Sequence, residues 1–233
     1  MKSNLLSDLQ ARIAAHHPCA LVTDTTTGAQ ALIGTGEVVG TLALTAEAQI
    51  EINRLIAANK SGVIGETSIF VRTYSPSPRM IIVGAVHIAQ SLVPMAQLAG
   101  FEAIVIDPRA AFLTSGKLAG ATAIEEWPDD GMKEARPDAR TAVVTLTHDP
   151  KLDDPALAAA LRSPAFYIGA LGSRKTHEKR LARLKADGFS DADLARIRGP
   201  VGLNINAISP AEIAVSIVAQ VIETLRAEAK SKA

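Results

Sequence analysis

Short apolar runs and helically spaced apolar positions alternate along the second part of the chain, in the order typical of parallel sheets. Arg79–Val83 and Glu102–Ile106 predict buried strands, and Ile88–Ala99 between them repeats apolar positions at helical spacing. This unit has the length of a strand–helix–strand motif, whose crossover is right-handed. The alternation continues with predicted strands at 141–146 and 165–170, and with predicted helices at 155–162 and from Pro210, after a Ser209 cap.

The first part of the chain follows a different pattern, with helical spacing over residues 5–15 and then several β-like runs. Strands are predicted at 20–23, 29–33, 38–44 and 68–73, and a second helix at 46–60. Pro76 and Pro78 lack backbone donors and disfavour helix before them, so we place a domain boundary there. The predicted fold is α/β, with a small α+β domain at residues 1–77. A Rossmann-like domain with a doubly wound parallel sheet follows at residues 78–233.

The composition is that of a soluble globular protein. Hydrophobic residues make up 48% and charged residues 21% of the chain, and Lys+Arg and Asp+Glu both total 24. This neutral balance and an aromatic content of 3% argue against nucleic acid as a partner. No apolar run reaches membrane-spanning length and the first residues lack a signal-like apolar block, so we expect a cytoplasmic protein without a membrane span.

The single cysteine, Cys19, limits the metal and redox chemistry that the sequence supports. One cysteine excludes an internal disulfide framework and a multi-cysteine metal site, and no histidine pairs with another ligand at recognised zinc spacing. We therefore assign no metal, and we expect Cys19 to be a buried small hydrophobe rather than a nucleophile. The sequence has no nucleophile-elbow, paired-carboxylate or P-loop pattern, so no catalytic residue is assigned.

Candidate binding residues follow the predicted strands, because ligands of open parallel sheets bind beyond the carboxyl ends of the strands. Four stretches are expected to gather at that edge of the sheet: Gly84–His87, Asp107–Arg109, Thr147–Asp149 and Leu171–Lys175. Imidazole exchanges protons near neutral pH, so His87 and the His148–Asp149 pair are candidate acid–base or ligand-contacting groups. The alternative is that they are hydrogen-bonded edge residues.

The turn after the first of these strands has the outline of a dinucleotide-binding turn. Gly84 stands at the tight-turn position, but Val86 stands where backbone approach to a pyrophosphate needs glycine. Asp107 follows 23 residues after Gly84, about where a ribose-binding carboxylate is expected, yet aspartate is also a common turn former. The pattern is strong evidence for the fold and weak evidence for NAD(P).

The segment after the strand at 165–170 is better suited to an anion. Gly172 permits close backbone approach, Ser173 can cap the following helix, and Arg174 and Lys175 bring positive charge to its first turn. Free N–H groups and the helix dipole favour an anion there, whereas unpaired cations at a helix N-terminus are mildly unfavourable. We therefore predict a site for phosphate or another anion; the alternative is a solvated basic turn.

Five segments together resemble the XdhC/CoxI proteins, which are accessory factors of xanthine dehydrogenase and related molybdenum hydroxylases. The segments are IIVGAVHIA, VIDPRAAF, TLTHDPKLDDPAL, FYIGALGSRKTHEKRL and GLNINAISPAEIAVSIVAQVI, which cover most of residues 80–222. The family combines a Rossmann-like C-terminal half with a separate small N-terminal domain. Two positions depart from its pattern: Val86 replaces the glycine of a GAGH-like turn, and Gly40–Leu44 lacks the cysteine of a Gly-Gly-Cys stretch.

The resemblance implies a molybdenum cofactor chaperone rather than an enzyme. Such a protein binds molybdopterin as cargo, shields it during sulfuration and passes it to a molybdenum hydroxylase client. A cysteine desulfurase and a second copy of the chain are further partners that the resemblance suggests. The residues implied to line the cofactor pocket are Gly84, Ala85, Val86, His87, Asp107, Arg109, His148, Asp149, Gly172, Ser173, Arg174 and Lys175. The terminal phosphate of the pterin would then be the anion expected at Arg174 and Lys175.

Two other functions stay open at this stage. The first is an NAD(P)-dependent oxidoreductase, which the strand–helix–strand unit and Asp107 permit but Val86 opposes. The second is a partner-binding adaptor that has no ligand and keeps only protein contacts. Binding of NAD(P) would favour the first, and client binding without any cofactor would favour the second.

Overall fold

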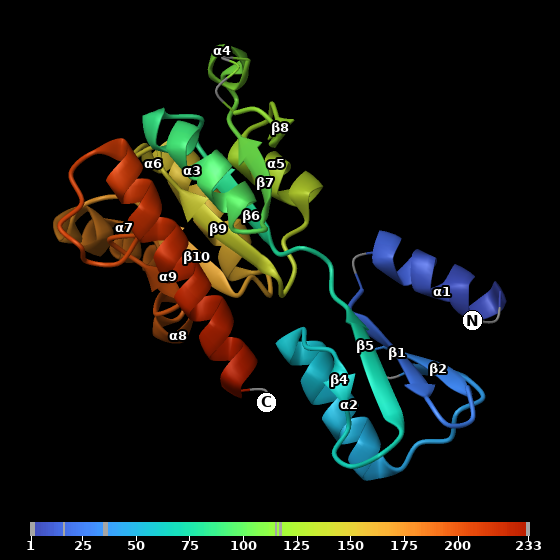
Figure 1. Ribbon diagram of the computed structural model, residues 1–233. Coiled ribbons are helices and arrows are strands. Elements are labelled where there is room, and N and C mark those ends of the chain that lie inside the picture. The colour runs from blue at the N-terminus through green and yellow to red at the C-terminus, as the bar shows by residue number, and fades with distance from the viewer. Residues whose placement is uncertain (1–2, 16, 35–36, 115, 117, 232–233) are drawn as a thin grey trace. The chain divides into compact units, whose positions relative to one another are not determined.

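The computed structural model describes residues 3–15, 17–34, 37–114, 116 and 118–231. These form two compact units, the first with the described residues up to Pro76 and those from Arg226 onward, and the second with those of Ser77–Leu225. The first unit contains an antiparallel sheet, and the second contains a parallel sheet with helices on its faces (Figure 1). Within the described ranges, no helix has the length and apolar character that crossing a membrane requires.

The first unit packs two helices with a five-stranded antiparallel sheet, counted over the described residues. Its elements are α1 (Ser3–Ala14), β1 (Cys19–Asp24), β2 (Gln30–Gly34), β3 (Glu37–Gly40), α2 (Ala46–Ala58), β4 (Gly62–Val63) and β5 (Ile69–Tyr74). The strand order is β3-β2-β1-β5-β4. Ala20 and Val22 of β1 are buried with Ile52 of α2, as the apolar positions of a half-covered sheet require.

In this unit one predicted strand needs correction and one strand was missed. The strand expected at 38–44 ends at Gly40, whose φ is +137° and where an added Cβ would lie 2.5 Å from the Gln30 carbonyl oxygen. The chain therefore leaves the sheet at a position that only glycine tolerates. Strand β4 was not predicted, because two residues are too short to show a period. Thr45 caps α2 by accepting a hydrogen bond from the Ala48 N–H.

The second unit has a six-stranded sheet, counted over the described residues, with all its strands parallel in the order β11-β10-β9-β6-β7-β8. The chain starts in the middle at β6, adds β7 and β8 on one side, and then adds β9 to β11 on the other. This is a doubly wound sheet, and the predicted fold class is confirmed. Its elements are β6 (Arg79–Val83), α3 (His87–Leu98), β7 (Glu102–Ile106), α4 (Ala110–Leu113), β8 (Thr122–Ile124), α5 (Pro128–Ala135), β9 (Thr141–Thr145), α6 (Pro150–Leu161), β10 (Tyr167–Ala170), α7 (Arg174–Ala186), α8 (Asp191–Leu194), β11 (Ile197–Arg198) and α9 (Pro210–Ser231).

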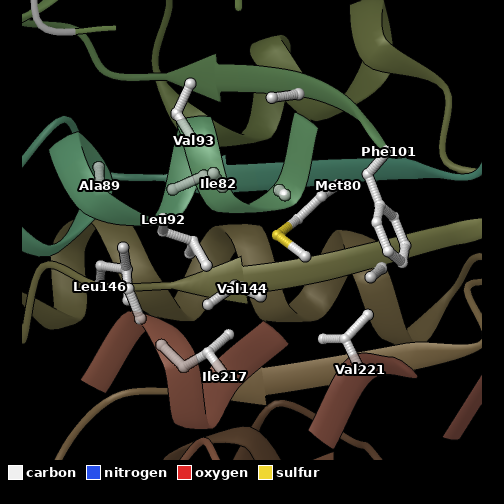
Figure 2. Close-up of a cluster of buried hydrophobic side chains, with 14 of the residues drawn as sticks. Met80, Ile82, Ala89, Leu92, Val93, Phe101, Val144, Leu146, Ile217 and Val221 are labelled. Atoms are coloured by element: carbon white, nitrogen blue, oxygen red, sulfur yellow. The ribbon is translucent and has the colours of Figure 1, made fainter. Parts of the chain in front are cut away.

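Both faces of the parallel sheet are buried, which explains why its strands are apolar without alternation. Successive residues point to opposite faces, so Met80 and Ile82 of β6 pack under α3 and α9, where Leu92 and Ile217 cover them. Figure 2 shows this cluster, with side chains of α3 and α9 meeting those of β6 and β9. The other face packs against α5, α6 and α7. The sheet is thus a rigid support for the loops at its carboxyl edge.

The helix predicted at 155–162 begins five residues earlier, at Pro150. Asp149 is its N-cap and accepts a hydrogen bond from the Lys151 N–H, with Pro150 at the first helical position. Pro155 lies inside the helix rather than at its start. Strands β9 and β10 are shorter than predicted, and α5 and β8 were not predicted, because their few apolar positions give no clear period.

Candidate functional site

The loops that follow β7, β6, β9 and β10 lie side by side at one edge of the sheet, because those four strands are consecutive in the sheet order. Backbone bonds tie the start of each loop to the neighbouring strand. Gly84 N donates to the Ile106 oxygen at 2.9 Å, and Leu171 N donates to the Thr145 oxygen at 2.9 Å. The four stretches that the sequence singled out therefore share one edge.

The turn between β6 and α3 is tight and requires glycine at position 84. Gly84 has φ +107°, and a Cβ there would lie 2.5 Å from Thr147 Cγ2. Val86 is the N-cap of α3 and makes no side-chain cap bond; its half-buried side chain packs against the α3–α9 core cluster. Ala85 is buried and His87 is exposed. His87 is therefore the polar side chain that this turn presents to solvent.

Asp107 closes this turn from within the protein. Its side chain is fully buried; Oδ2 accepts from the Ala85 N–H at 2.8 Å and from Arg109 Nη2 at 2.8 Å. Oδ1 accepts from Arg109 Nε at 2.8 Å and from the Arg109 N–H at 3.0 Å. Burial alone would raise the pKa of Asp107, but the bonds from Arg109 and Ala85 outweigh it and hold that pKa below its ordinary value. Asp107 stands where a ribose-binding carboxylate is expected, but both of its oxygens already accept hydrogen bonds from the protein.

Arg109 is half exposed and also lies over the Phe112 ring, with 4.4 Å from its guanidinium carbon to the ring centroid. Its bidentate pairing with Asp107 raises the pKa of Arg109 further above its ordinary value. This arginine therefore keeps its charge while fixing the end of β7.

The loop after β9 uses its three predicted residues mainly to shape the backbone. His148 is exposed and has φ +62°, the left-handed region that few non-glycine residues adopt. Asp149 caps α6, and Thr147 Oγ1 donates to Asp153 Oδ1 at 2.7 Å. An added Cβ on Gly172 would lie 3.7 Å from His148 Nδ1, so His148 reaches toward the loop after β10.

The start of α7 combines a capped helix end with free cations. Ser173 Oγ accepts from the Thr176 N–H at 3.2 Å and lies 3.0 Å from Thr176 Oγ1, so this hydroxyl serves the helix cap. Arg174 and Lys175 are exposed, and within the described ranges neither has an ion-pair partner. Gly172, with φ +137°, lets the chain turn sharply into the helix.

Two residues that the sequence interpretation missed lie directly beneath this loop. Asp153 and Arg180 are 1% and 2% exposed and form an ion pair of 3.2 Å, and Arg180 Nη2 also donates to the Leu171 oxygen at 2.9 Å. Burial raises the pKa of Asp153 even though Thr147 and Arg180 oppose that rise. Asp153 follows Asp149 by four residues and Arg180 follows Thr176 by four, and that helical spacing is the signal that the sequence offers.

A hollow of about 240 Å³ opens between the start of α6 and one face of α7. It is lined mainly by basic and hydroxyl side chains: His148, Pro150, Asp153, Ser173, Lys175, Thr176, Lys179, Arg180 and Arg183. Arg174 is not among these residues, although the sequence interpretation paired it with Lys175. The arrangement can bind a small anion, because most of its polar groups are donors.

The described residues contain no group of three or more His, Cys, Asp or Glu side chains placed to hold a metal ion. Cys19 lies in the other unit, fully buried with Leu5, Leu9 and Leu32. That burial raises the pKa of the Cys19 thiol, although Arg12 opposes the rise, so the thiolate is disfavoured.

Three features define the structural class of this protein. They are a doubly wound parallel sheet, a first turn whose Ala85 N–H is bonded to Asp107, and a basic hollow at the carboxyl edge of the sheet. The XdhC Rossmann domain family matches residues 80–221, which is more than half of the chain, and the chain belongs to this family. The resemblance found in the sequence motifs is thereby confirmed.

Similar proteins from two bacteria carry related names. The chain is 35% identical over 162 residues to a Bacillus subtilis protein named as a probable xanthine dehydrogenase subunit, covering 68% of this chain and 46% of that protein. It is 32% identical over 148 residues to the molybdenum cofactor insertion chaperone PaoD of Escherichia coli, covering 64% of this chain and 40% of that protein. The chain thus spans less than half the length of these relatives.

A solved structure extends the likeness to almost the whole chain. The crystal structure of a protein described as a xanthine dehydrogenase from Bacillus halodurans matches with a TM-score of 0.77 and 26% sequence identity. The match covers 98% of this chain and 68% of that one. The likeness therefore includes the first unit, which the family match at residues 80–221 does not reach.

Proposed function

We propose that this protein is an accessory factor that binds molybdenum cofactor as cargo and delivers it to a molybdenum hydroxylase. Membership of the XdhC family and the name of the Escherichia coli relative support this proposal. The observation that carries it is the basic hollow at the carboxyl edge of the sheet, because molybdopterin ends in a phosphate that needs donors and positive charge.

The proposed cofactor site uses the twelve predicted residues in two ways. His87, Arg109, His148 and Lys175 present exposed polar groups along the edge and would contact the cargo. The others shape the loops: the glycines allow sharp turns, Val86 packs against the core, and the carboxylate and hydroxyl groups are engaged as caps and braces. These supporting residues are Gly84, Ala85, Val86, Asp107, Asp149, Gly172 and Ser173. Arg174 would add charge from outside the hollow.

The proposed partners follow from this role. The client is a molybdenum hydroxylase of the xanthine dehydrogenase type, in keeping with the name of the Bacillus subtilis relative. A cysteine desulfurase would supply sulfur to the bound cofactor. This sulfur transfer and the delivery to the client would take place in the cytoplasm. We assign the protein itself no catalytic residue, so its contribution is to hold, orient and protect the cargo.

The experiment is anaerobic purification from two hosts, one that makes molybdopterin and one that cannot. We expect pterin and phosphate to copurify with the protein from the first host alone, measured as oxidised pterin fluorescence and as phosphate per chain. The loaded protein should then activate a cofactor-free hydroxylase. Protein that carries no pterin from the producing host, and activates no client, would contradict the proposal.

The oxidoreductase alternative is opposed by the turn after β6. Asp107 accepts the Ala85 N–H, which is a donor that a pyrophosphate would use, and Val86 fills the position of the second glycine. The adaptor alternative predicts client binding without cofactor, and the two-host experiment separates it from the chaperone.

A further inference from the structure

We infer that the hollow between α6 and α7 is a phosphate-monoester site in which Lys175, Lys179 and Arg180 bind a dianion. The inference deepens the proposed function and rests on it only for the identity of the natural ligand. It also shifts the predicted anion site, from the first turn of α7 at Ser173–Lys175 to the side of this helix that faces α6, so that Lys175 stays in the site and Arg174 leaves it.

The spacing of the basic residues places them on one face. Lys175, Lys179 and Arg183 are four residues apart in turn, and Arg180 follows Thr176 by four, so all of them line the same side of α7. Arg174 lies one position earlier and points elsewhere, since it does not line the hollow. The side of the helix on which a residue lies, rather than its nearness to the helix start, decides which residues bind the anion.

Charge pairing leaves two of these cations available. Arg183 is held by Asp154, with 3.0 Å from Nη2 to Oδ1. Lys175 and Lys179 have no ion-pair partner in the part of the chain that the structure describes. Like charges at this four-residue spacing destabilise a helix, so the pair costs free energy until an anion lies between them.

Arg180 supplies an independent sign of a ligand. Its side chain is 2% exposed and lines the hollow, yet Nε and Nη1 have no hydrogen-bond partner within the described ranges. Asp153 and the Leu171 oxygen hold Nη2, which fixes the plane of the guanidinium group. Buried donors left without acceptors are costly and rare, and the oxygens of a bound anion would satisfy them.

The size and charge of the hollow select the class of ligand. About 240 Å³ is below the range of roughly 300–1,000 Å³ typical of sites for drug-sized ligands, so the hollow takes an anionic group rather than a whole nucleotide. A phosphate monoester carries a charge of about −1.5 to −2 at pH 7, which matches the two unpaired lysines. A diester phosphate carries only about one negative charge and has about two terminal oxygens in place of the three of a monoester.

The test measures binding of inorganic phosphate and glycerol phosphate by calorimetry, with NADH as a diphosphate comparator. The test variant is Lys175→Ala/Lys179→Ala. The matched control is Arg198→Ala/Lys151→Ala, which removes the same charge from exposed positions of the same unit that do not line the hollow. We expect the test variant to bind both phosphate probes at least about tenfold more weakly, which is about 1.4 kcal/mol, while the control changes by less than about threefold.

Equal losses in the two variants would overturn the inference, as would a wild-type protein that binds neither phosphate probe or binds NADH more tightly. An Arg180→Lys variant adds a second arm, since it keeps the charge beside Asp153 but loses the planar fork; its phosphate affinity should fall while circular dichroism stays native. Phosphate binding by wild-type protein that carries no pterin would refute the proposed function alone. Full pterin retention by the double lysine variant would refute this inference alone.

Discussion

The turns after β6 and β10 lie at the same edge of one sheet but differ in whether their hydrogen-bond donors are already bonded within the protein. Both contain a glycine in the left-handed region, at Gly84 and Gly172, and both lead into a long helix. In the first turn, a buried aspartate from the next strand takes the available backbone donor. In the second, two exposed lysines and a buried arginine lie beside a hollow; among the described residues the lysines have no ion-pair partner, and Nε and Nη1 of the arginine have no hydrogen-bond partner.

This difference teaches that the backbone outline of a nucleotide-binding turn does not define its ligand. The strand–turn–helix geometry is common to both turns, but binding requires donors that are free in the folded protein. In the turn that looks more like a dinucleotide site, the Ala85 N–H is already bonded to Asp107, whereas beside the other turn Arg180 keeps two nitrogens without a partner among the described residues.

The largest expected effect comes from breaking the buried pair beneath the second turn. Asp153→Ala leaves Arg180 charged and buried without its carboxylate, so we expect the free energy of unfolding to fall by about 3–5 kcal/mol. Urea denaturation measures it. The control, Asp154→Ala, removes a carboxylate whose partner Arg183 is 40% exposed, and it should cost under about 1 kcal/mol. Equal costs would show that burial of the pair has no special role.

The first turn should be less sensitive but clearly dependent on its aspartate. Asp107→Asn replaces a charged acceptor of four hydrogen bonds, and we expect the free energy of unfolding to fall by about 1.5–3 kcal/mol. Phosphate affinity should stay at the wild-type value, because the residue does not line the hollow. A loss of phosphate binding in a folded Asp107→Asn protein would contradict the separation of the two turns.

The two buried aspartates should respond to pH in opposite directions. The pKa of Asp107 is lowered by folding, so its stabilisation is complete above the unfolded value of about 3.9 and is lost as pH falls through the lower folded pKa. The pKa of Asp153 is raised, so its contribution is present below about 3.9 and declines as pH rises through the folded pKa. Denaturation of wild type, Asp107→Asn and Asp153→Asn from pH 3 upward checks both slopes. Parallel slopes for the two variants would refute the assignment.

A smaller effect is expected at Val86, the residue that blocks the second glycine position. Val86→Gly removes a half-buried side chain and should cost about 1 kcal/mol of unfolding free energy. NADH and NADPH should still not bind at micromolar concentrations, because Asp107 continues to occupy the Ala85 N–H. Fluorescence titration measures this, and micromolar binding would show that the side chain was the whole obstacle.

The smallest functional effect is expected in the other unit. Cys19 is fully buried among apolar side chains and burial raises its pKa, so Cys19→Ala should leave cofactor retention and client activation unchanged. Its cost in stability should be about 1 kcal/mol. Lost activation with a native circular dichroism spectrum would instead assign the thiol a role.

The sequence predicted the parallel sheet well because burial on both faces makes its strands uninterrupted apolar runs. Arg79–Val83 and Glu102–Ile106 match β6 and β7 at both ends. Helix boundaries were less predictable where a cap competes with a pattern, as at Asp149 and Pro150.

The sequence could predict where the candidate site lies, at the carboxyl edge of the sheet, but not which side chains pair with one another there. Asp107 pairs with a backbone N–H 22 residues earlier, and Arg180 pairs with Asp153 across 27 residues, and such contacts depend on the folded sheet. The same limit explains Ser173, whose hydroxyl suits either a cap or an anion until the Thr176 N–H is seen to use it. Local spacing fixes which face a residue lies on, while its partner comes from another element.

Asp107 also competes, as a part of the chain itself, with any ligand for the Ala85 N–H. An open turn of this kind would fill with whichever dinucleotide is abundant in the cell, since occupancy follows the ratio of ligand concentration to Kd. A carboxylate that belongs to the chain has a high effective concentration at the Ala85 N–H, and dilution does not lower it. If the protein carries a scarce cofactor as proposed, this internal bond would keep its first turn from filling with common metabolites.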